Sequence, residues 1–261
     1  MNEAKNEPAG QAPPKQVDIV CLYPQDMNIY GDLGNLKVIE TRARLYGYQP
    51  MVHMYNVGDP WPERADLLVG GGGQDHGQIS VGEDLEKIAP KLRSLADAGV
   101  PILVICGLYQ LLGHDFETVE GEKISGIGLL DVHTVGQKVR MIGNLTEHTQ
   151  EFGDVIGYEN HSGQTFLGPG SQAWGRVDAD GTGNNGQDHT EGARYKNVIG
   201  TYLHGSLLPK NPAVADFLIK TAITNRYGKF EDASTPSQKK ELAMLNRLAA
   251  RARKSAMARP R

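Results

Sequence analysis

The feature that most constrains the fold is a set of four short apolar segments within the first 106 residues. Residues 33–47 lie between the first and second segments, and residues 81–98 lie between the third and fourth. Both stretches have apolar residues at helical spacing. Strands that alternate with helices form a parallel sheet with helices on both faces. The four segments are QVDIVCL (16–22), MVHMYNV (51–57), ADLLVG (65–70) and PILVIC (101–106).

Beyond about residue 126 the chain changes to short strand-like segments separated by turns, which we expect to extend the same sheet in antiparallel fashion. A helix follows, with Pro212 in its first turn and Gly228 just past its end. The predicted fold class is α/β: a mostly parallel sheet with helices on both faces and an antiparallel extension. The later segments are GIGLLDV (126–132), QKVRMIGNL (137–145), DVIGYEN (154–160), QAWGRVD (172–178) and NVIGTYL (197–203).

Composition divides the chain into three parts. Residues 1–16 have no apolar run and are predicted to be a disordered N-terminal segment. Residues 17–228 contain no internal repeat and no linker, which favours a single domain. Residues 229–261 form a basic tail.

The tail is strongly basic, because Ser237–Arg261 holds eight Lys or Arg residues and one acid, whereas the whole chain carries a net charge of −4. The body is therefore acidic, which argues against nucleic acid as a substrate. In the tail, Leu242, Leu245 and Leu248 share a helical stripe. This pattern is typical of a solvated or frayed terminal helix or of a segment that docks on a partner.

The two cysteines, Cys21 and Cys106, follow apolar segments, where a disulfide framework would not place them. No run approaches the roughly 18 apolar residues of a membrane span, and the first sixteen residues do not resemble a signal peptide. We therefore expect a soluble, cytoplasmic protein without stable membrane insertion.

Cys106 lies where the fourth strand ends and a helical segment begins. Ligands of parallel sheets bind beyond the carboxyl ends of the strands. A helix N-terminus there favours a thiolate and can hold an oxyanion through the N–H of Gly107. Taken alone, however, Cys106 is more typical of a buried core residue, because Cys is among the most buried residue types.

A run of four glycines, Gly70–Gly73, ends the neighbouring strand. Residues without a Cβ can turn their N–H groups toward a ligand, so the run is typical of an oxyanion loop or of a plain tight turn. A phosphate loop is disfavoured, because no GK[ST] follows.

His204 is the best candidate for a catalytic base among the eight histidines. It ends an apolar strand and precedes Gly205, a position that directs an imidazole from a sheet edge into a cleft. No histidine or acid shows convincing metal-ligand spacing, so no metal site is predicted. The pairs considered are Asp75 with His76 and Asp188 with His189.

The order strand-GGG, strand-Cys-Gly-x-x-Gln, strand-His resembles the class I (triad-type) glutamine amidotransferases, in the branch that includes the cobyric acid synthases. The segments LLVGGGGQD, VICGLYQLLG, GYENHSG and IGTYLHG carry this resemblance. Within the branch, YPQDMNIYGDLGN, GNNGQDHTEG and TYLHGSLLPKNP are most similar to the glutaminase (GatD) subunits of lipid II isoglutaminyl synthases. The resemblance covers Val17–Tyr227.

The resemblance implies an enzyme that hydrolyses L-glutamine through a Cys106 thioester, with His204 as base and with the N–H groups of Gly72, Gly73 and Gly107 around the oxyanion. Ammonia would pass to a separate Mur-ligase-like subunit, MurT, in a heterodimer. That partner uses ATP to amidate the D-glutamate of lipid II in peptidoglycan biosynthesis. This chain itself would need no cofactor.

Two substrate contacts are implied as well. The family's glutamine-contacting arginine falls on Arg140, and a guanidinium can bind the α-carboxylate of free glutamine bidentately. Without the resemblance, a solvated strand arginine is the more usual interpretation. Gln110 matches Cys-Gly-x-x-Gln, one helical turn beyond Cys106, and is expected to line the pocket.

Two departures from the family pattern bear on the site. Val104 and Leu108 stand where many of these enzymes have glycine, which predicts a less sharp or more crowded turn at the nucleophile. Gly205 and Ser206 follow His204, whereas relatives with a self-contained triad have an acid two residues on. We expect the partner to supply the acid; a distant acid in this chain is the alternative.

Three other functions stay open on the sequence. The chain could serve a corrinoid synthetase of the cobyric or cobyrinic acid type. It could be a non-catalytic amidotransferase-like module that regulates its ligase, an interpretation that the missing acid supports. It could also be a cysteine hydrolase of similar topology that acts alone.

Overall fold

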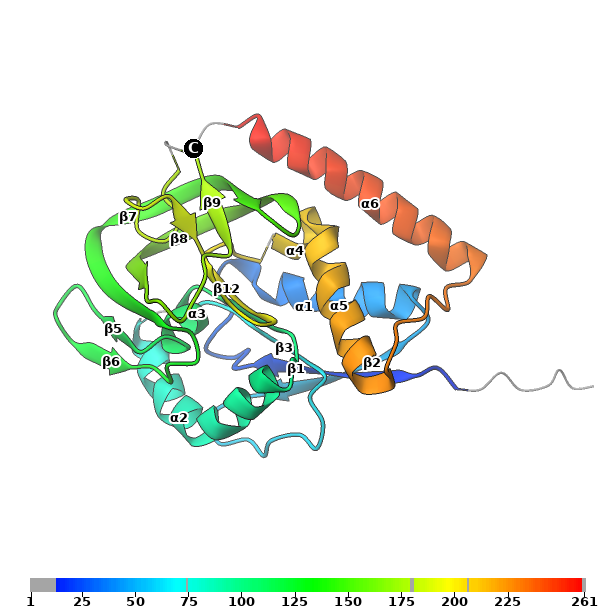
Figure 1. Ribbon diagram of the computed structural model, residues 1–261, viewed down its shortest axis with the longest axis horizontal. Coiled ribbons are helices and arrows are strands. Elements are labelled where there is room, and N and C mark those ends of the chain that lie inside the picture. Colours follow the sequence, from blue (N-terminus) through cyan, green and yellow to red (C-terminus); the bar gives the residue numbers. More distant parts are fainter. Residues whose placement is uncertain (1–12, 74, 179–180, 206, 260–261) are drawn as a thin grey trace, which may run out of the picture.

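The computed structural model describes residues 13–73, 75–178, 181–205 and 207–259 (Figure 1). The predicted disordered segment, residues 1–16, falls mostly outside this description, and strand β1 already begins at Gln16. The described elements form two sheets with helices around them.

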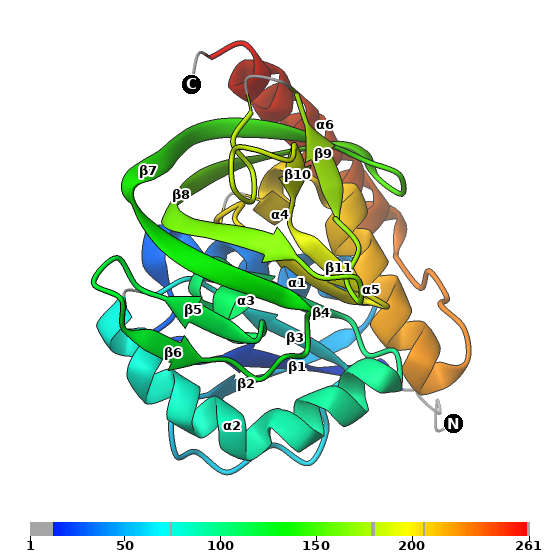
Figure 2. The ribbon, with the colours of Figure 1, turned by 60° about the vertical axis from the view of Figure 1, so that its left-hand side comes forward.

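The first sheet contains six strands in the order β11-β12-β4-β3-β1-β2. All neighbours are parallel except the edge pair β11 and β12. The parallel sheet predicted from the first half of the chain is confirmed (Figure 2). Strand β12 joins it beside β4. Its strands are β1 (Gln16–Leu22), β2 (Gln49–Tyr55), β3 (Leu67–Gly70), β4 (Ile102–Ile105), β11 (Ala193–Tyr195) and β12 (Val198–Thr201).

The remaining strands form a second sheet, in the order β10-β9-β7-β5-β6 with β8 paired to β7. The expectation that the later segments extend the first sheet in antiparallel fashion is therefore wrong for most of them. Only segment 197–203 joins the first sheet, as β12, and it pairs with β4 in parallel. Buried and exposed residues alternate along much of β7 and β8, so these strands suit a separate layer with one solvated face. Residues 126–131 precede β7 and are not a strand. The strands are β5 (Asp115–Glu117), β6 (Lys123–Ser125), β7 (Val132–Thr149), β8 (Gly153–Leu167), β9 (Gly175–Val177) and β10 (Thr190–Glu191).

Helices cover both faces of the first sheet, as predicted: α2 lies on one face, and α1 and α5 lie on the other (Figures 1 and 2). Helix α5 begins at Pro212, and Gly228 lies just past its end, also as predicted; Gly228 is in the left-handed conformation. No helix in the described ranges is long and apolar enough to cross a membrane. The helices are η1 (Ile29–Gly31), α1 (Leu33–Leu45), α2 (Asp75–Asp97), α3 (Gly107–Leu111), α4 (Leu207–Lys210), α5 (Pro212–Tyr227) and α6 (Pro236–Met257).

The basic tail forms the long helix α6, which begins with a capping box between Thr235 and Gln238. Leu242 is buried against the body, whereas Leu248 is half exposed. The guanidinium of Arg253 donates to Asn211 and to a backbone carbonyl of β8. The helix is therefore packed on its own chain and is not a frayed end, and its docking on a partner stays a prediction.

Candidate active site

Cys106 occupies a sharp turn between β4 and α3, with φ 50° and ψ −104°. A non-glycine residue holds such a conformation only where its surroundings enforce it. Here the N–H of Cys106 donates to Thr201 of β12 at 2.8 Å, and the carbonyl of Cys106 accepts from Gln110 in α3. The expectation of a less sharp turn is therefore wrong.

Room for this turn comes from the neighbouring strands. Val104 is in register with Gly70 on β3 and with Gly200 on β12. A Cβ on Gly70 would collide with the side chain of Leu108, and one on Gly200 would collide with Tyr109. Glycines on the two flanking strands thus make room for the bulky residues of the turn.

His204 follows β12 and faces Cys106 across Gly72. A Cβ added to Gly72 would lie 3.0 Å from both Cys106 Cβ and His204 Cε1, and 3.4 Å from the thiol sulfur. Both side chains are buried. The structure thus brings the predicted nucleophile and base together, and it requires glycine between them.

Asp32, just before α1, supplies a carboxylate beside the histidine. Both of its carboxylate oxygens lie 3.3 Å from His204 Nδ1, and one of them accepts the N–H of Gly72 at 2.7 Å. The expectation that the acid comes only from a partner is corrected: an acid of this chain occupies the position. The missing acid also no longer supports a non-catalytic module.

The surroundings of His204 favour its charged form. Burial lowers the pKa of His204, but hydrogen bonding and charge interactions with Asp32 and Cys106 outweigh burial and raise it to about 10. At neutral pH the imidazole is therefore protonated next to the thiol. A positive charge beside a thiol favours the thiolate, which is the nucleophilic form of cysteine.

The predicted oxyanion donors divide into two groups. The N–H of Gly72 already donates to Asp32, so Gly72 is not an oxyanion donor and that assignment is wrong. Gly73 and Gly107 remain, and they lie side by side, because a Cβ on Gly107 would be 2.9 Å from the backbone nitrogen of Gly73. Their N–H groups are the two predicted oxyanion donors that remain.

A cavity of about 390 Å³ opens beside Cys106. Gly73 and Cys106, which follow β3 and β4, line it, and one wall comes from β7 and β8. Arg140 lines that wall, and its guanidinium donates to the side-chain oxygen of Asn160 at 2.8 and 3.1 Å. Arg140 therefore lies in the same cavity as the nucleophile, as a contact to the α-carboxylate of glutamine requires.

Gln110 also lines the cavity, and its amide is hydrogen-bonded within the protein. Its nitrogen donates to the hydroxyl of Tyr202 at 3.1 Å, and its oxygen accepts from Gln78 at 3.0 Å. Gln110 thus ties helix α3 to the end of β12.

Residues 18–212 match the model of the CobB/CobQ-like glutamine amidotransferase domain. The chain belongs to this family. It is a glutamine amidotransferase, and the paired thiol and imidazole in its cavity agree with the hydrolysis of glutamine.

Two relatives align with most of this amidotransferase. They are the lipid II isoglutaminyl synthase (glutamine-hydrolyzing) subunits GatD of Staphylococcus aureus (strain N315) and of Streptococcus pneumoniae (strain ATCC BAA-255 / R6). Each is 35% identical over 83% of this chain, and the alignments cover 88% and 84% of the relatives, respectively. The resemblance noted in the sequence is confirmed.

A solved structure described as a glutamine amidotransferase has the same fold. The TM-score is 0.55 at 15% identity, over 78% of this chain and 98% of the other. This likeness confirms the α/β fold class of the amidotransferase.

Sequence reasoning missed three residues at the amidotransferase site. Asp32 and Tyr30 lie in YGDLGN, 172 residues or more before His204, and no local spacing links them to it. The ring of Tyr30 meets that of His204 edge-on at 4.8 Å. His161 is buried on β8, stacks on Tyr202 at 3.5 Å and lines the cavity.

Proposed function

We propose that this chain hydrolyses L-glutamine at Cys106 and delivers the ammonia to a Mur-ligase-like subunit, MurT, which amidates lipid II. The observation that carries the hydrolysis is the line Cys106–His204–Asp32, buried at the end of a cavity that also contains Arg140. The proposed acceptor rests on the two relatives aligned with most of the chain, whose names give them as lipid II isoglutaminyl synthase subunits.

In the proposed first step the Cys106 thiolate attacks the side-chain carbonyl carbon of glutamine. The N–H groups of Gly73 and Gly107 stabilise the oxyanion of the tetrahedral intermediate. As the C–N bond breaks, protonated His204 donates its Nε2 proton to the leaving nitrogen, so ammonia departs and a thioester remains.

In the second step a water molecule replaces ammonia. His204, now neutral, removes a proton from that water as it attacks the thioester. The C–S bond then breaks, glutamate leaves, and the thiolate and imidazolium return. Asp32 keeps His204 in the orientation that directs Nε2 toward the sulfur in both steps.

Arg140 is proposed to bind the α-carboxylate of glutamine. Asn160 holds one edge of the guanidinium through two hydrogen bonds, which restricts how the group can turn. A guanidinium held in this way pairs with a carboxylate at a smaller cost in side-chain entropy.

The proposal assigns ATP and the acceptor to the partner, in a heterodimer in the cytoplasm, and no cofactor to this chain. Ammonia must travel to the partner in a protected path, because in bulk water most of it becomes ammonium, which is not nucleophilic. A corrinoid synthetase is the alternative partner. An assay of which acceptor is amidated, lipid II or a corrinoid acid, distinguishes the two.

The test measures glutamate release by the purified chain, alone and with a MurT-like ligase. Cys106→Ala should abolish release. Cys21→Ala is the matched control: Cys21 is buried in β1, and burial raises the pKa of its thiol to about 12, so it takes no part. Release that survives Cys106→Ala, or that is absent even with the ligase, would contradict the proposal.

A further inference from the structure

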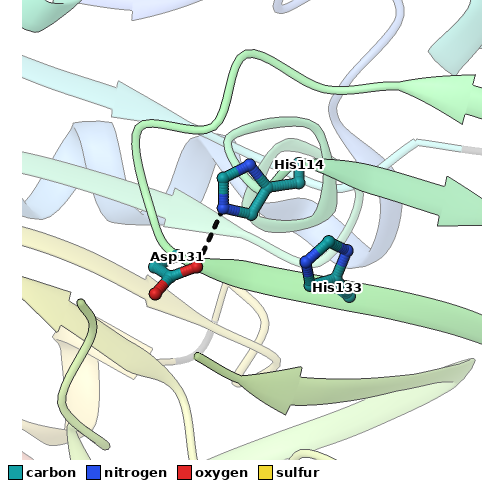
Figure 3. Close-up of side chains that lie close together, drawn as sticks. All are labelled: His114, Asp131 and His133. Carbon is teal, nitrogen blue, oxygen red and sulfur yellow. Dashed lines mark hydrogen bonds and ion pairs between the residues drawn. The ribbon is translucent and has the colours of Figure 1, made fainter. Parts of the chain in front are cut away.

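A group of three metal-ligand side chains lies outside the cavity (Figure 3). His114 follows helix α3, whereas Asp131 and His133 stand at the beginning of β7. Each residue offers one ligand atom, and these atoms all lie within 4.8 Å of one another. We propose that His114, Asp131 and His133 bind a divalent transition-metal ion of the Zn²⁺ class.

The direct contact within the group joins His114 to Asp131. Nε2 of His114 lies 2.8 Å from a carboxylate oxygen of Asp131, as the dashed line in Figure 3 shows. The ring of His133 stacks beside that of His114, with centroids 4.8 Å apart and planes 23° apart. Two imidazole rings in this arrangement can share one cation.

A fourth side chain orients His133. Asp115, its register partner on β5, has a carboxylate oxygen 3.0 Å from Nδ1 of His133. A carboxylate that holds one ring nitrogen leaves the other, Nε2, as the metal ligand, an arrangement common in zinc sites. Asp115 is therefore the proposed positioning residue.

The Asp131 carboxylate packs closely against the backbone of two glycines. It accepts the N–H of Gly170 at 2.7 Å, and a Cβ on Gly168 would collide with both of its oxygens. His114 is fitted as well, because a Cβ on Gly128 would lie 2.8 Å from its Nδ1. These backbone approaches hold two of the three ligands in place.

The chemistry of the donor set favours zinc. Two imidazoles and a carboxylate bind Zn²⁺ at about 2.0–2.2 Å, and the remaining position takes water. Tetrahedral ligands at that distance are about 3.3 Å apart, so His133 must move inward by roughly 1–1.5 Å. Its side chain is about half exposed, which leaves room for that rotation and a path for the ion.

Such an ion would connect two parts of the active-site wall. His114 ends the segment that begins at Cys106, and strand β7, in which His133 is the second residue, continues to Arg140. The ion would hold helix α3 and strand β7 at a fixed separation and would take no part in the reaction.

The experiment titrates untagged full-length chain with ZnCl₂ by calorimetry, after dialysis against EDTA. The chain carries Cys106→Ser, so that zinc at the active-site thiol is not counted. We expect one ion per chain, loss of saturable binding in His114→Ala and in His133→Ala, and binding weakened about 10- to 100-fold in Asp115→Asn. Mg²⁺ should not compete, since it prefers oxygen ligands.

His148→Ala is the matched control, because His148 is also exposed and paired with two carboxylates, Asp154 and Asp178. It should bind Zn²⁺ like the parent, and Zn²⁺ should raise the Tm of both but not of His114→Ala. Circular dichroism in EDTA checks that each variant is folded. No binding by the parent, or equal binding by the His114 and His133 variants, overturns the proposal.

Discussion

At the residue scale, the reaction depends on three side chains that meet around Gly72. Cys106 supplies the nucleophile, His204 moves the proton, and Asp32 holds His204 Nδ1. Because the Gly72 N–H also binds Asp32, one backbone group fixes the acid and keeps the space between thiol and imidazole open.

Replacing Asp32 tests whether the acid of this chain is used. In Asp32→Asn we expect kcat for glutamine hydrolysis to fall by about 100- to 10,000-fold, because His204 loses its orienting carboxylate. The pKa of His204, which Asp32 helps to raise to about 10, should also fall. The imidazolium is fully present below that pKa and is lost above it, so the alkaline limb of the pH profile should move to lower pH.

Steady-state rates from pH 6 to 10.5 provide the measurement, and Asp59→Asn, in an exposed loop, is the control. A parent-like rate and profile in Asp32→Asn, with the ligase present, would show that another acid acts on His204.

Arg140 gives a second prediction at this scale. Arg140→Lys keeps the charge but loses bidentate pairing, so KM for glutamine should rise by about tenfold or more, with a smaller effect on kcat. Lys138→Ala removes a neighbouring exposed cation on β7 and should leave KM unchanged. If both substitutions raised KM equally, Arg140 would act only through its positive charge and not by pairing with the α-carboxylate.

At the element scale, the turn at Cys106 depends on the absence of a side chain at one position in each neighbouring strand. Gly70 on β3 gives room for Leu108 of α3, and Gly200 on β12 gives room for Tyr109. The elements that flank the nucleophile are thus fitted to one another, and α3 can begin directly at Cys106 although bulky residues surround it.

This fit predicts coupling between Gly70 and Leu108. Gly70→Ala should destabilise the protein by about 1–3 kcal/mol through overpacking and should reduce activity by displacing α3. The double variant Gly70→Ala, Leu108→Ala should lose less stability than the sum of the single variants, because the new methyl group fills space that Leu108 leaves.

Urea denaturation measures both effects. Gly82→Ala in α2 is the control, because its new Cβ would meet nothing closer than 3.8 Å, and better helix propensity should stabilise it by up to about 1 kcal/mol. Strict additivity of the Gly70 and Leu108 substitutions would contradict the proposed fit.

At the scale of the whole molecule, buried acids join the two sheets. Glu191 of β10 accepts from the hydroxyl of Thr201 at 2.9 Å and from the N–H of Tyr202 at 2.7 Å, just before His204. Burial raises the pKa of Glu191 to about 7. Burial, together with the charge of Glu191, raises the pKa of Glu147 on β7 well above its usual value.

The Glu147 shift predicts how stability depends on pH. Above pH 4.5 the unfolded chain ionises this carboxyl while the folded chain keeps it protonated, so Glu147 lowers stability increasingly as pH rises. Glu147→Gln removes that penalty and should raise Tm by a few degrees at pH 8, with less effect at pH 5. Thermal denaturation at both values tests this, with the exposed Glu120→Gln as control; a gain independent of pH would contradict it.

The sequence by itself determined the features that depend on local pattern and strand order. Apolar periodicity predicts the parallel sheet and its helices, and the ends of two strands identify Cys106 and His204, because parallel strands end at one edge. The matching motifs add Arg140, which the structure places in the same cavity.

Only the tertiary structure decided the rest, because those features join residues without a local signal. Asp32 reaches His204 across 172 positions, and the same contact removes Gly72 from the oxyanion donors. In the second sheet, long β7 and β8 bury alternate residues along much of their length, and together they line the cavity beside Cys106. Contacts between distant segments depend on how the elements pack, and the residue pattern of a single strand or helix does not predict that packing.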